Sequence, residues 1–127
     1  MKLLLDTHTV IWFITNDKSL SANAKKIIED TSNVCFVSIA SLWEISIKYR
    51  LGKLELKKTI EIIFDLIEQT GFQILPIFPE HLLTNSQLEL HHRDPFDRLM
   101  ISQAIFENYT IITKDPLFML YEVDLFW

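Results

Sequence analysis

The sequence contains very little glycine and almost no cysteine. Its 127 residues include two Gly and one Cys, Cys35, which lies in the apolar run VCFV. A single cysteine excludes a disulfide framework within the chain and a zinc site built on cysteines. Gly52 and Gly71 do not lie in a phosphate-cradling loop, so P-loop and dinucleotide-binding motifs are absent. We expect Cys35 to be a small buried hydrophobic side chain.

Long hydrophobic segments are also missing. No apolar run approaches the roughly 20 residues that a transmembrane helix needs, and KLLL at residues 2–5 is too short for the core of a signal peptide. We therefore predict a cytoplasmic protein. A length of 127 residues predicts one domain, residues 1–127, because domains commonly contain roughly 100–200 residues. The hydrophobic share of 49% favours a dense core, with a surplus that can cover a partner-binding face.

An excess of positive charge is the third absence. The net charge of −5 argues against a protein that binds nucleic acid mainly by general electrostatic attraction. A nuclease is not excluded, because clustered carboxylates lower the net charge and a bound cation reverses the field where a phosphate would lie. The basic residues gather in one segment: Lys48, Arg50, Lys53, Lys57 and Lys58. A solvated helix end and loop is the commoner meaning of such a cluster, and contact with an RNA backbone is the alternative.

Short apolar runs alternate with longer amphipathic segments, a pattern typical of a mostly parallel sheet covered by helices. The predicted strands are residues 2–5, 34–37, 72–77, 109–113 and 123–126. The predicted helices cover residues 10–14, 22–30, 39–50, 59–69 and 95–108, with further helical segments starting at Pro79 and Pro116. Ser21 and Ser38 are expected N-caps. Pro76 lacks an amide for the ladder, so the third strand should lie at a sheet edge or end early.

Four acidic residues interrupt or end hydrophobic segments. Asp6 follows KLLL, Glu44 lies inside SLWEISI, Asp97 lies inside DPFDRLMISQA, and Asp115 closes TIITKD. Carboxylates rarely enter apolar surroundings unless they are paired, hydrogen-bonded or bound to metal. Asp6 and Asp115 follow predicted strands, whose carboxyl ends form the ligand-binding edge of a parallel sheet. Helical spacing turns Glu44 and Asp97 toward the same region, so we predict one shared site.

The shared site predicts a divalent cation. Two carboxylates about 4 Å apart repel by roughly 4 kcal/mol at an effective dielectric constant of 20, so several need a compensating charge. Oxygen ligands, with no cysteine set and no well-spaced histidine pair, favour Mg²⁺ or Mn²⁺ over zinc. Such an ion activates a water and polarises a phosphoryl group, which suits phosphodiester hydrolysis.

Three of these four acids also have a purely structural explanation. Asp6 and Asp115 are placed to cap the segments that follow them, and Asp97 lies near a helix start, where the dipole favours an acid. Glu44 lies in the middle of a helix and has no capping role. His8 follows the first acid closely, and we expect it at the surface or in a hydrogen bond, with contact to substrate as the alternative.

Other polar and aromatic residues receive structural predictions. Asp94 should cap the helix that begins at Pro95, and the adjacent His91 and His92 should face solvent. Trp12 and Trp43 occupy helical positions with apolar neighbours, and we expect both in the core.

Four segments of the chain resemble those of PIN-domain ribonucleases, specifically the VapC-type toxins of toxin–antitoxin pairs. These segments are LLLDTHTVIW at residues 3–12, SIASLWEISIKYRLGKL at 38–54, HRDPFDRLMISQA at 92–104 and IITKDPLF at 111–118. They follow the expected order, and the resemblance covers essentially the whole chain. The resemblance implies an α/β fold, a three-layer α/β/α sandwich around a mostly parallel sheet.

The resemblance also implies a site and partners. It makes Asp6, Glu44, Asp97 and Asp115 the acidic quartet that holds Mg²⁺ or Mn²⁺, with Asp6 and Asp97 as direct ligands. It gives auxiliary roles to Thr7 and Thr113, through hydrogen bonds, and to Arg98, through phosphate or a partner chain. Similar proteins cleave RNA endonucleolytically, commonly dimerise, and are inhibited by a small antitoxin that obstructs the acid pocket. We therefore expect an RNA substrate, a cognate antitoxin and a homodimer.

Two other functions share features with the predicted ribonuclease. A Mg²⁺-dependent aspartyl-phosphate phosphatase or receiver also places an aspartate after its first parallel strand. The Asp-x-Asp phosphatase pattern fails here because His8 occupies the second of those acidic positions. A non-catalytic RNA-binding module would keep the fold, but the intact acids make it less attractive.

Overall fold

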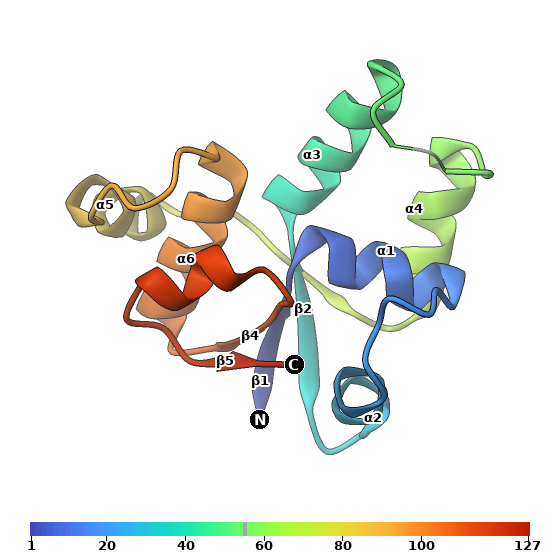
Figure 1. Cartoon of the computed structure of the whole chain (residues 1–127), viewed down its shortest axis with the longest axis horizontal. Coiled ribbons are helices and arrows are strands. Elements are labelled where there is room, and N and C mark those ends of the chain that lie inside the picture. Colours follow the sequence, from blue (N-terminus) through green and yellow to red (C-terminus); the bar gives the residue numbers. More distant parts are fainter. Residues whose placement is uncertain (55) are drawn as a thin grey trace.

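The computed structural model describes residues 1–54 and 56–127. A five-stranded sheet with the order β3-β2-β1-β4-β5 lies at its centre, and the neighbouring strands pair in parallel (Figure 1). The strands are β1 (Lys2–Leu5), β2 (Val34–Ser38), β3 (Gln73–Leu75), β4 (Thr110–Ile112) and β5 (Leu125–Phe126). The five predicted strands are confirmed, and β3 ends immediately before Pro76 at one edge of the sheet.

Helices cover both faces of the sheet. They are α1 (Thr7–Thr15), α2 (Ala22–Glu29), α3 (Ile39–Arg50), α4 (Ile60–Gln69), α5 (Pro79–Gln87), α6 (Pro95–Glu107) and the 3₁₀ helix η1 (Pro116–Leu120). The predicted caps are confirmed, because Ser21 Oγ accepts from the amide of Ala24 at 3.0 Å and Ser38 Oγ from that of Ala40 at 3.1 Å. These bonds satisfy amides that a helix start leaves without partners.

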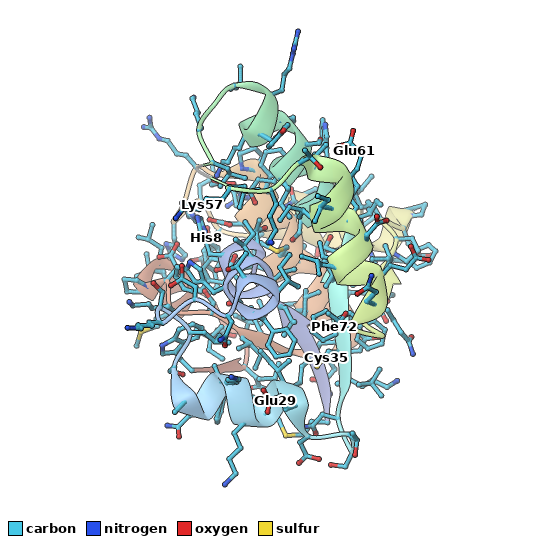
Figure 2. The ribbon with its side chains drawn as sticks, turned by 90° about the vertical axis from the view of Figure 1, so that its right-hand side faces the viewer. His8, Glu29, Cys35, Lys57, Glu61 and Phe72 are labelled. Carbon is cyan, nitrogen blue, oxygen red and sulfur yellow. The ribbon has the colours of Figure 1, made fainter. Side chains whose placement is uncertain are left out.

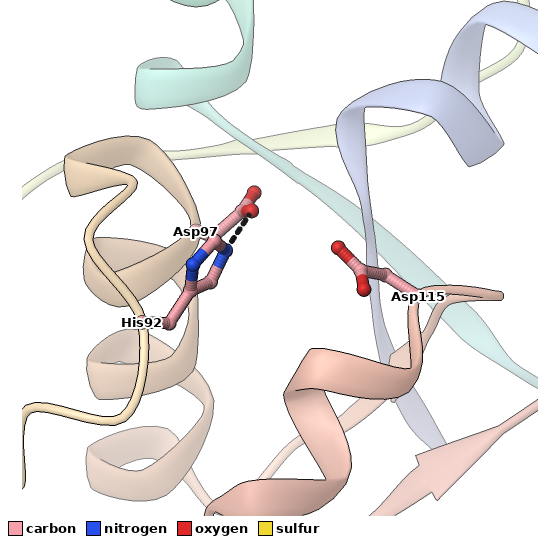
Figure 3. A group of neighbouring side chains, drawn as sticks. All are labelled: His92, Asp97 and Asp115. Atoms are coloured by element: carbon pink, nitrogen blue, oxygen red, sulfur yellow. Dashed lines mark hydrogen bonds and ion pairs between the residues drawn. The ribbon is translucent and has the colours of Figure 1, made fainter.

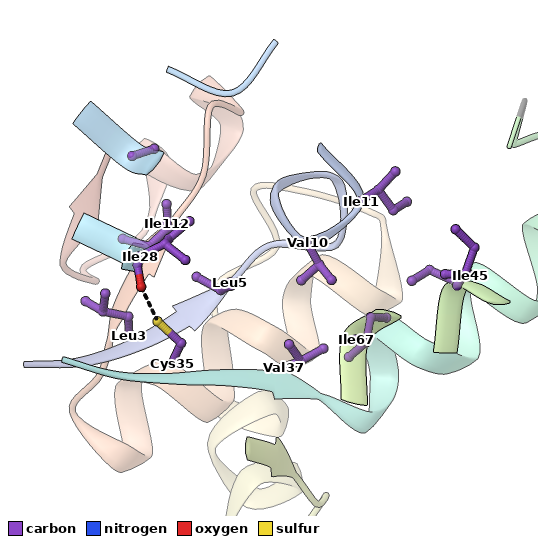
Figure 4. Packing of buried hydrophobic residues seen from close by; sticks show 12 residues of the cluster. Leu3, Leu5, Val10, Ile11, Ile28, Cys35, Val37, Ile45, Ile67 and Ile112 are labelled. Atoms are coloured by element: carbon purple, nitrogen blue, oxygen red, sulfur yellow. Dashed lines mark hydrogen bonds between the residues drawn. The ribbon is translucent and has the colours of Figure 1, made fainter. Parts of the chain in front are cut away.

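Alternate side chains of β1 enter two separate cores. Leu3 and Leu5 pack with residues of α1, α2, α3 and α4, whereas Leu4 packs with residues of α6 and η1 on the opposite face (Figure 4 shows the first core). All three leucines are fully buried, and each contributes roughly 1.5–3 kcal/mol. Helices on both faces of a parallel sheet make the predicted three-layer α/β/α sandwich. Cys35 is buried in the first core as predicted, and burial raises the pKa of its thiol to about 11.

The strand order reverses direction between β1 and β4. The chain runs outward from β1 to β2 and β3, then returns to β4 on the other side of β1 and continues to β5. Such a switch point leaves a crevice at the carboxyl ends of the two strands. Asp6 follows β1 directly, and its amide donates to the carbonyl oxygen of Ile112 in β4 at 3.1 Å. The fold therefore places the first predicted acid at this crevice.

One aromatic prediction is wrong. The side chain of Trp43 is 59% exposed, and its ring meets that of Phe96 edge-on with the centroids 5.3 Å apart. The neighbouring Glu44 and Ile45 are buried, so α3 turns Trp43 away from the core. Apolar neighbours in sequence did not predict burial because adjacent residues on a helix do not share a face. Trp12 is partly buried and packs against the first core.

No helix in the described ranges is both long and apolar enough to cross a membrane.

Candidate active site

The four predicted acids line one cleft of about 570 Å³. Asp6 comes from the end of β1, Glu44 from α3, Asp97 from the first turn of α6, and Asp115 from the residue before η1. The remaining lining residues are His8, Trp12, Lys48, His92, Asp94, Lys114 and Pro116. Five carboxylates and two lysines surround the cleft, which gives a formal excess of three negative charges when every carboxylate is ionised.

Asp6 is held at the switch point by a threonine of the neighbouring segment. Thr113 Oγ1 donates to Asp6 Oδ2 at 2.8 Å and accepts from the amide of Asp115 at 3.1 Å. Asp6 is buried, with only 6% of the residue exposed. Burial raises the pKa of Asp6, and the charge of Glu44 adds to this, while the Thr113 bond and His8 oppose it. Asp6 is therefore poorly compensated when it is ionised.

Glu44 has a partner for each carboxylate oxygen. Thr7 Oγ1 donates to Oε1 at 2.7 Å, and Lys48 Nζ contacts Oε2 at 2.5 Å. The same Thr7 oxygen lies 2.9 Å from Ser41 Oγ, which joins α1 to α3. Partial burial disfavours the charged form of Lys48, but the bond to Glu44 and the charges of nearby acids leave its pKa raised. Glu44 and Lys48 thus form an ion pair at one wall of the cleft.

Asp97, on the wall of the cleft that α6 forms (the α6 wall), has a different environment from Glu44 on the α3 wall. Its Oδ2 lies 2.7 Å from His92 Nε2. Burial is the main cause that raises the pKa of Asp97 to about 7, with repulsion from Asp6, Asp94 and Glu44, while the His92 contact opposes the shift. Asp94 itself caps α6, because its Oδ1 accepts from the amide of Asp97 at 3.1 Å. The cap predicted for Asp94 is confirmed, and the same residue also lines the cleft.

His92, Asp97 and Asp115 form a close group of ligand-type side chains. One ligand atom from each lies within 4.8 Å of the other two, and Figure 3 shows the carboxylates of Asp97 and Asp115 on either side of a gap. Asp115 Oδ1 also accepts from the amide of Leu117 at 2.9 Å, so it caps η1 as well. The structural and the site explanations for Asp115 therefore both apply.

The cleft suits a hard divalent cation. Asp6, Asp97 and Asp115 supply carboxylate oxygens, and a cation would offset both their burial and their repulsion. These three residues, with His92 beside them, are the ones that would hold it. Mg²⁺ suits an all-oxygen set, whereas Mn²⁺ also accepts an imidazole nitrogen. When bound, such an ion activates water and polarises a phosphoryl oxygen.

Sequence patterns did not reveal His92, Lys48 or Lys114 as residues of the site. His92 was expected to face solvent, but its side chain is only 14% exposed and contacts Asp97. Neither histidine of the adjacent pair lies in a periodic segment, so no pattern distinguished them. Lys48 was read as part of a basic cluster, although its spacing of four from Glu44 is that of a helical ion pair.

The auxiliary residues fall in different places. Thr7 and Thr113 make the hydrogen bonds to Glu44 and Asp6 described above. Arg98 does not line the cleft. Its guanidinium instead donates to the carbonyl oxygens of Glu89 and Leu88, at 2.8 and 3.3 Å, and to the hydroxyl of Tyr121 at 3.1 Å. Arg98 therefore fastens the loop before α6.

Comparison with known proteins identifies the family. The PIN domain model matches residues 3–123, and the chain belongs to the PIN domain family. No curated protein matches the sequence at a significant level.

The solved structures that resemble the chain share its fold over nearly its whole length. VapBC2 from Rickettsia felis, bound to a DNA fragment from its promoter, is 20% identical with a TM-score of 0.75, covering 99% of this chain and 98% of that one. DNA-bound VapBC from Salmonella typhimurium is 17% identical with a TM-score of 0.73, covering 99% and 97%. VapBC-1 from nontypeable Haemophilus influenzae is 17% identical with a TM-score of 0.71, covering 99% and 97%.

Proposed function

We propose that the protein is a Mg²⁺- or Mn²⁺-dependent endoribonuclease and the toxin of a type II toxin–antitoxin pair. The observation that carries the proposal is the meeting of Asp6, Glu44, Asp97 and Asp115 around one cleft at the switch point of a PIN domain. An anionic cleft repels an RNA phosphate unless a cation lies between them, so phosphate binding at this site requires a metal. The proposed reaction is hydrolysis of a phosphodiester bond by an activated water.

The residues that line the cleft have different roles in the proposed reaction. Asp6, Asp97 and Asp115, which line the cleft, would hold the cation. Glu44 is fixed by Thr7 and Lys48, so its carboxylate keeps one position during turnover. Lys114 lines the same cleft, where an ammonium can meet a phosphate oxygen that the cation does not contact. These positions orient the phosphate without a conformational change of the sheet.

The partner proposals depend on likeness to known complexes. The three similar structures named above are VapBC assemblies, two of them bound to DNA, and we propose that this chain likewise binds a cognate antitoxin and forms a homodimer. Exposed apolar side chains are available for such contacts, including Leu82, Leu83 and Leu90, which are 54%, 64% and 84% exposed. Light scattering should give twice the chain mass of 15.0 kDa, and a monomer at micromolar concentration would contradict the homodimer.

Cleavage of RNA by the purified protein tests the enzymatic proposal. With Mg²⁺ or Mn²⁺ the protein should cleave members of a panel of structured RNAs, and EDTA should stop cleavage. Asp6→Asn removes one charge at the switch point and should abolish cleavage while thermal melting shows that the variant is folded. Asp65→Asn is the matched control, because Asp65 is exposed on α4. Full activity of Asp6→Asn would refute the site.

A covalent phosphoryl intermediate would favour the phosphatase or receiver alternative instead. Labelling of Asp6 by beryllofluoride would be its signature. The ribonuclease proposal expects none.

A further inference from the structure

A second groove of about 490 Å³ adjoins the acidic cleft. His8 and Trp12, on α1, line both the cleft and the groove, so the two form a continuous path over α1. The far wall of the groove contains Lys57 and Lys58, in the turn that precedes α4. Figure 2 shows the side on which His8 and Lys57 lie. A strand that occupies the cleft can therefore continue into this groove.

The ridge between cleft and groove is aromatic and fixed in place. The rings of His8 and Trp12 have centroids 5.7 Å apart at an interplanar angle of 43°. Trp127 meets the Trp12 ring edge-on at 5.9 Å, and Lys114 Nζ lies 5.9 Å from its centroid. Trp12 is partly buried, while His8 is exposed. Preset aromatic faces of this kind stack on nucleic-acid bases without strong sequence preference.

The described lining residues of the groove are more basic than those of the cleft. Their charged members are Lys57, Lys58 and Asp17, two positive charges and one negative charge. Both lysines are exposed. The backbone amide of Ser19 donates to Asp17 Oδ1 at 2.8 Å and lowers the pKa of Asp17. Asp17 is therefore an anion in the same groove as the two lysines. A phosphate next to an aromatic surface matches this pattern of charge and shape.

We propose that this groove is a subsite for the nucleotide next to the scissile phosphate of an RNA strand. The base stacks on the His8–Trp12 ridge, and the adjoining phosphate lies near Lys57 and Lys58. The inference rests on the proposed ribonuclease function, since it assumes a strand whose phosphate lies among the acids. It gives the basic segment before α4 a role in substrate binding.

Binding of RNA to a protein that cannot cleave it tests the subsite. The probe is a fluorescein-labelled, mixed-sequence single-stranded oligoribonucleotide, and anisotropy is measured in the Asp6→Asn background with Mg²⁺ present. Adding Lys57→Gln with Lys58→Gln should weaken binding about tenfold and lower the slope of log Kd against log salt by about 1 to 2. Adding His8→Ala should weaken binding about fivefold through lost stacking. Lys25→Gln with Lys26→Gln, an adjacent exposed pair on α2, should leave binding unchanged.

The outcomes separate the subsite from the function. Unchanged affinity in both groove variants would overturn the subsite, even if the native protein cleaves RNA and Asp6→Asn does not. Equal weakening of RNA binding by the α2 lysine substitutions would also overturn the subsite, because the effect would then reflect nonspecific electrostatic attraction. Weaker binding of a polyglutamate peptide with unchanged RNA binding would assign the groove to an acidic polypeptide instead. Absence of any RNA cleavage by the native protein would refute the proposed function itself.

Discussion

The two walls of the acidic cleft give their carboxylates different surroundings: Glu44 is compensated by neighbouring donors, whereas Asp97 is repelled by other acids. On the α3 wall, both oxygens of Glu44 have donors, Thr7 and Lys48, within 2.7 Å. On the α6 wall, Asp97 has one contact to His92 and faces repulsion from three other acids. The protein thus neutralises one wall with its own side chains, and we propose that a cation compensates the other. Four acids in one cleft therefore have at least two different physical roles.

The largest effect should follow from loss of charge on the α6 wall. Asp97→Asn keeps the shape of the side chain but removes one proposed cation ligand, so RNA cleavage in Mg²⁺ should fall by roughly 10²–10³-fold. Initial rates with saturating cation, measured beside Asp65→Asn, give the comparison. An Asp97→Asn enzyme within threefold of the native rate would contradict the division between the walls.

The next effect concerns the residue that orients Asp97. His92→Gln retains a hydrogen-bond donor but changes its reach, and cation affinity should fall about 10- to 100-fold, as for other groups that orient a ligand. Mn²⁺ titration followed by calorimetry measures the change. The neighbouring His91→Gln is the control, because His91 contacts Glu89 rather than the cleft acids. Equal affinities for the two variants would mean that His92 does not position Asp97.

The two walls should also respond with opposite signs in the absence of metal. Glu44→Gln leaves Lys48 without its charged partner, and should lower the unfolding free energy by roughly 2 kcal/mol, less than a fully buried pair because Lys48 is partly exposed. Asp97→Asn relieves the repulsion from neighbouring acids and should raise the unfolding free energy. Urea unfolding in EDTA tests both signs. Destabilisation by both variants would show that the walls are equivalent.

A smaller effect is the pH dependence of the metal-free protein. The folded-state pKa of Asp97 is about 7, against an ordinary value of 3.8, so between these values the folded protein binds a proton that the unfolded chain does not. Stability should therefore rise as the pH falls from 8 toward 5 in EDTA. Thermal melting across this range shows the slope, and Asp97→Asn should flatten it. A native slope of the opposite sign would mean that Asp97 is compensated after all.

Most of the fold could be predicted from the sequence because its signals are local. Apolar runs gave all five strands, and hydroxyl caps gave the helix starts at Ser21 and Ser38. Pro76 predicted a third strand that lies at an edge or ends early, since a missing amide breaks the ladder, and β3 does both. The exposure of Trp43 could not be predicted in this way, because it depends on which face of α3 meets the sheet.

The acids of the cleft were predictable for the same reason, whereas their partners were not. An acid that ends an apolar run, such as Asp6, is visible in one segment, and the switch point then joins segments distant in sequence. His92 reaches Asp97 across the boundary between a loop and a helix, where no periodicity applies. Lys48 follows Glu44 at the spacing of a helical ion pair, but it also belongs to a basic cluster in the sequence, and the spacing alone does not distinguish the two roles.

Calorimetric titration of Mn²⁺ into the metal-free protein tests the asymmetry of the cleft most directly. The native protein and Glu44→Gln should both bind the ion, because the α6 wall is intact in each, whereas Asp97→Asn should give no binding heat at the same concentrations. Binding by Asp97→Asn equal to that of the native protein, or no binding by the native protein, would contradict a cation held on the α6 wall.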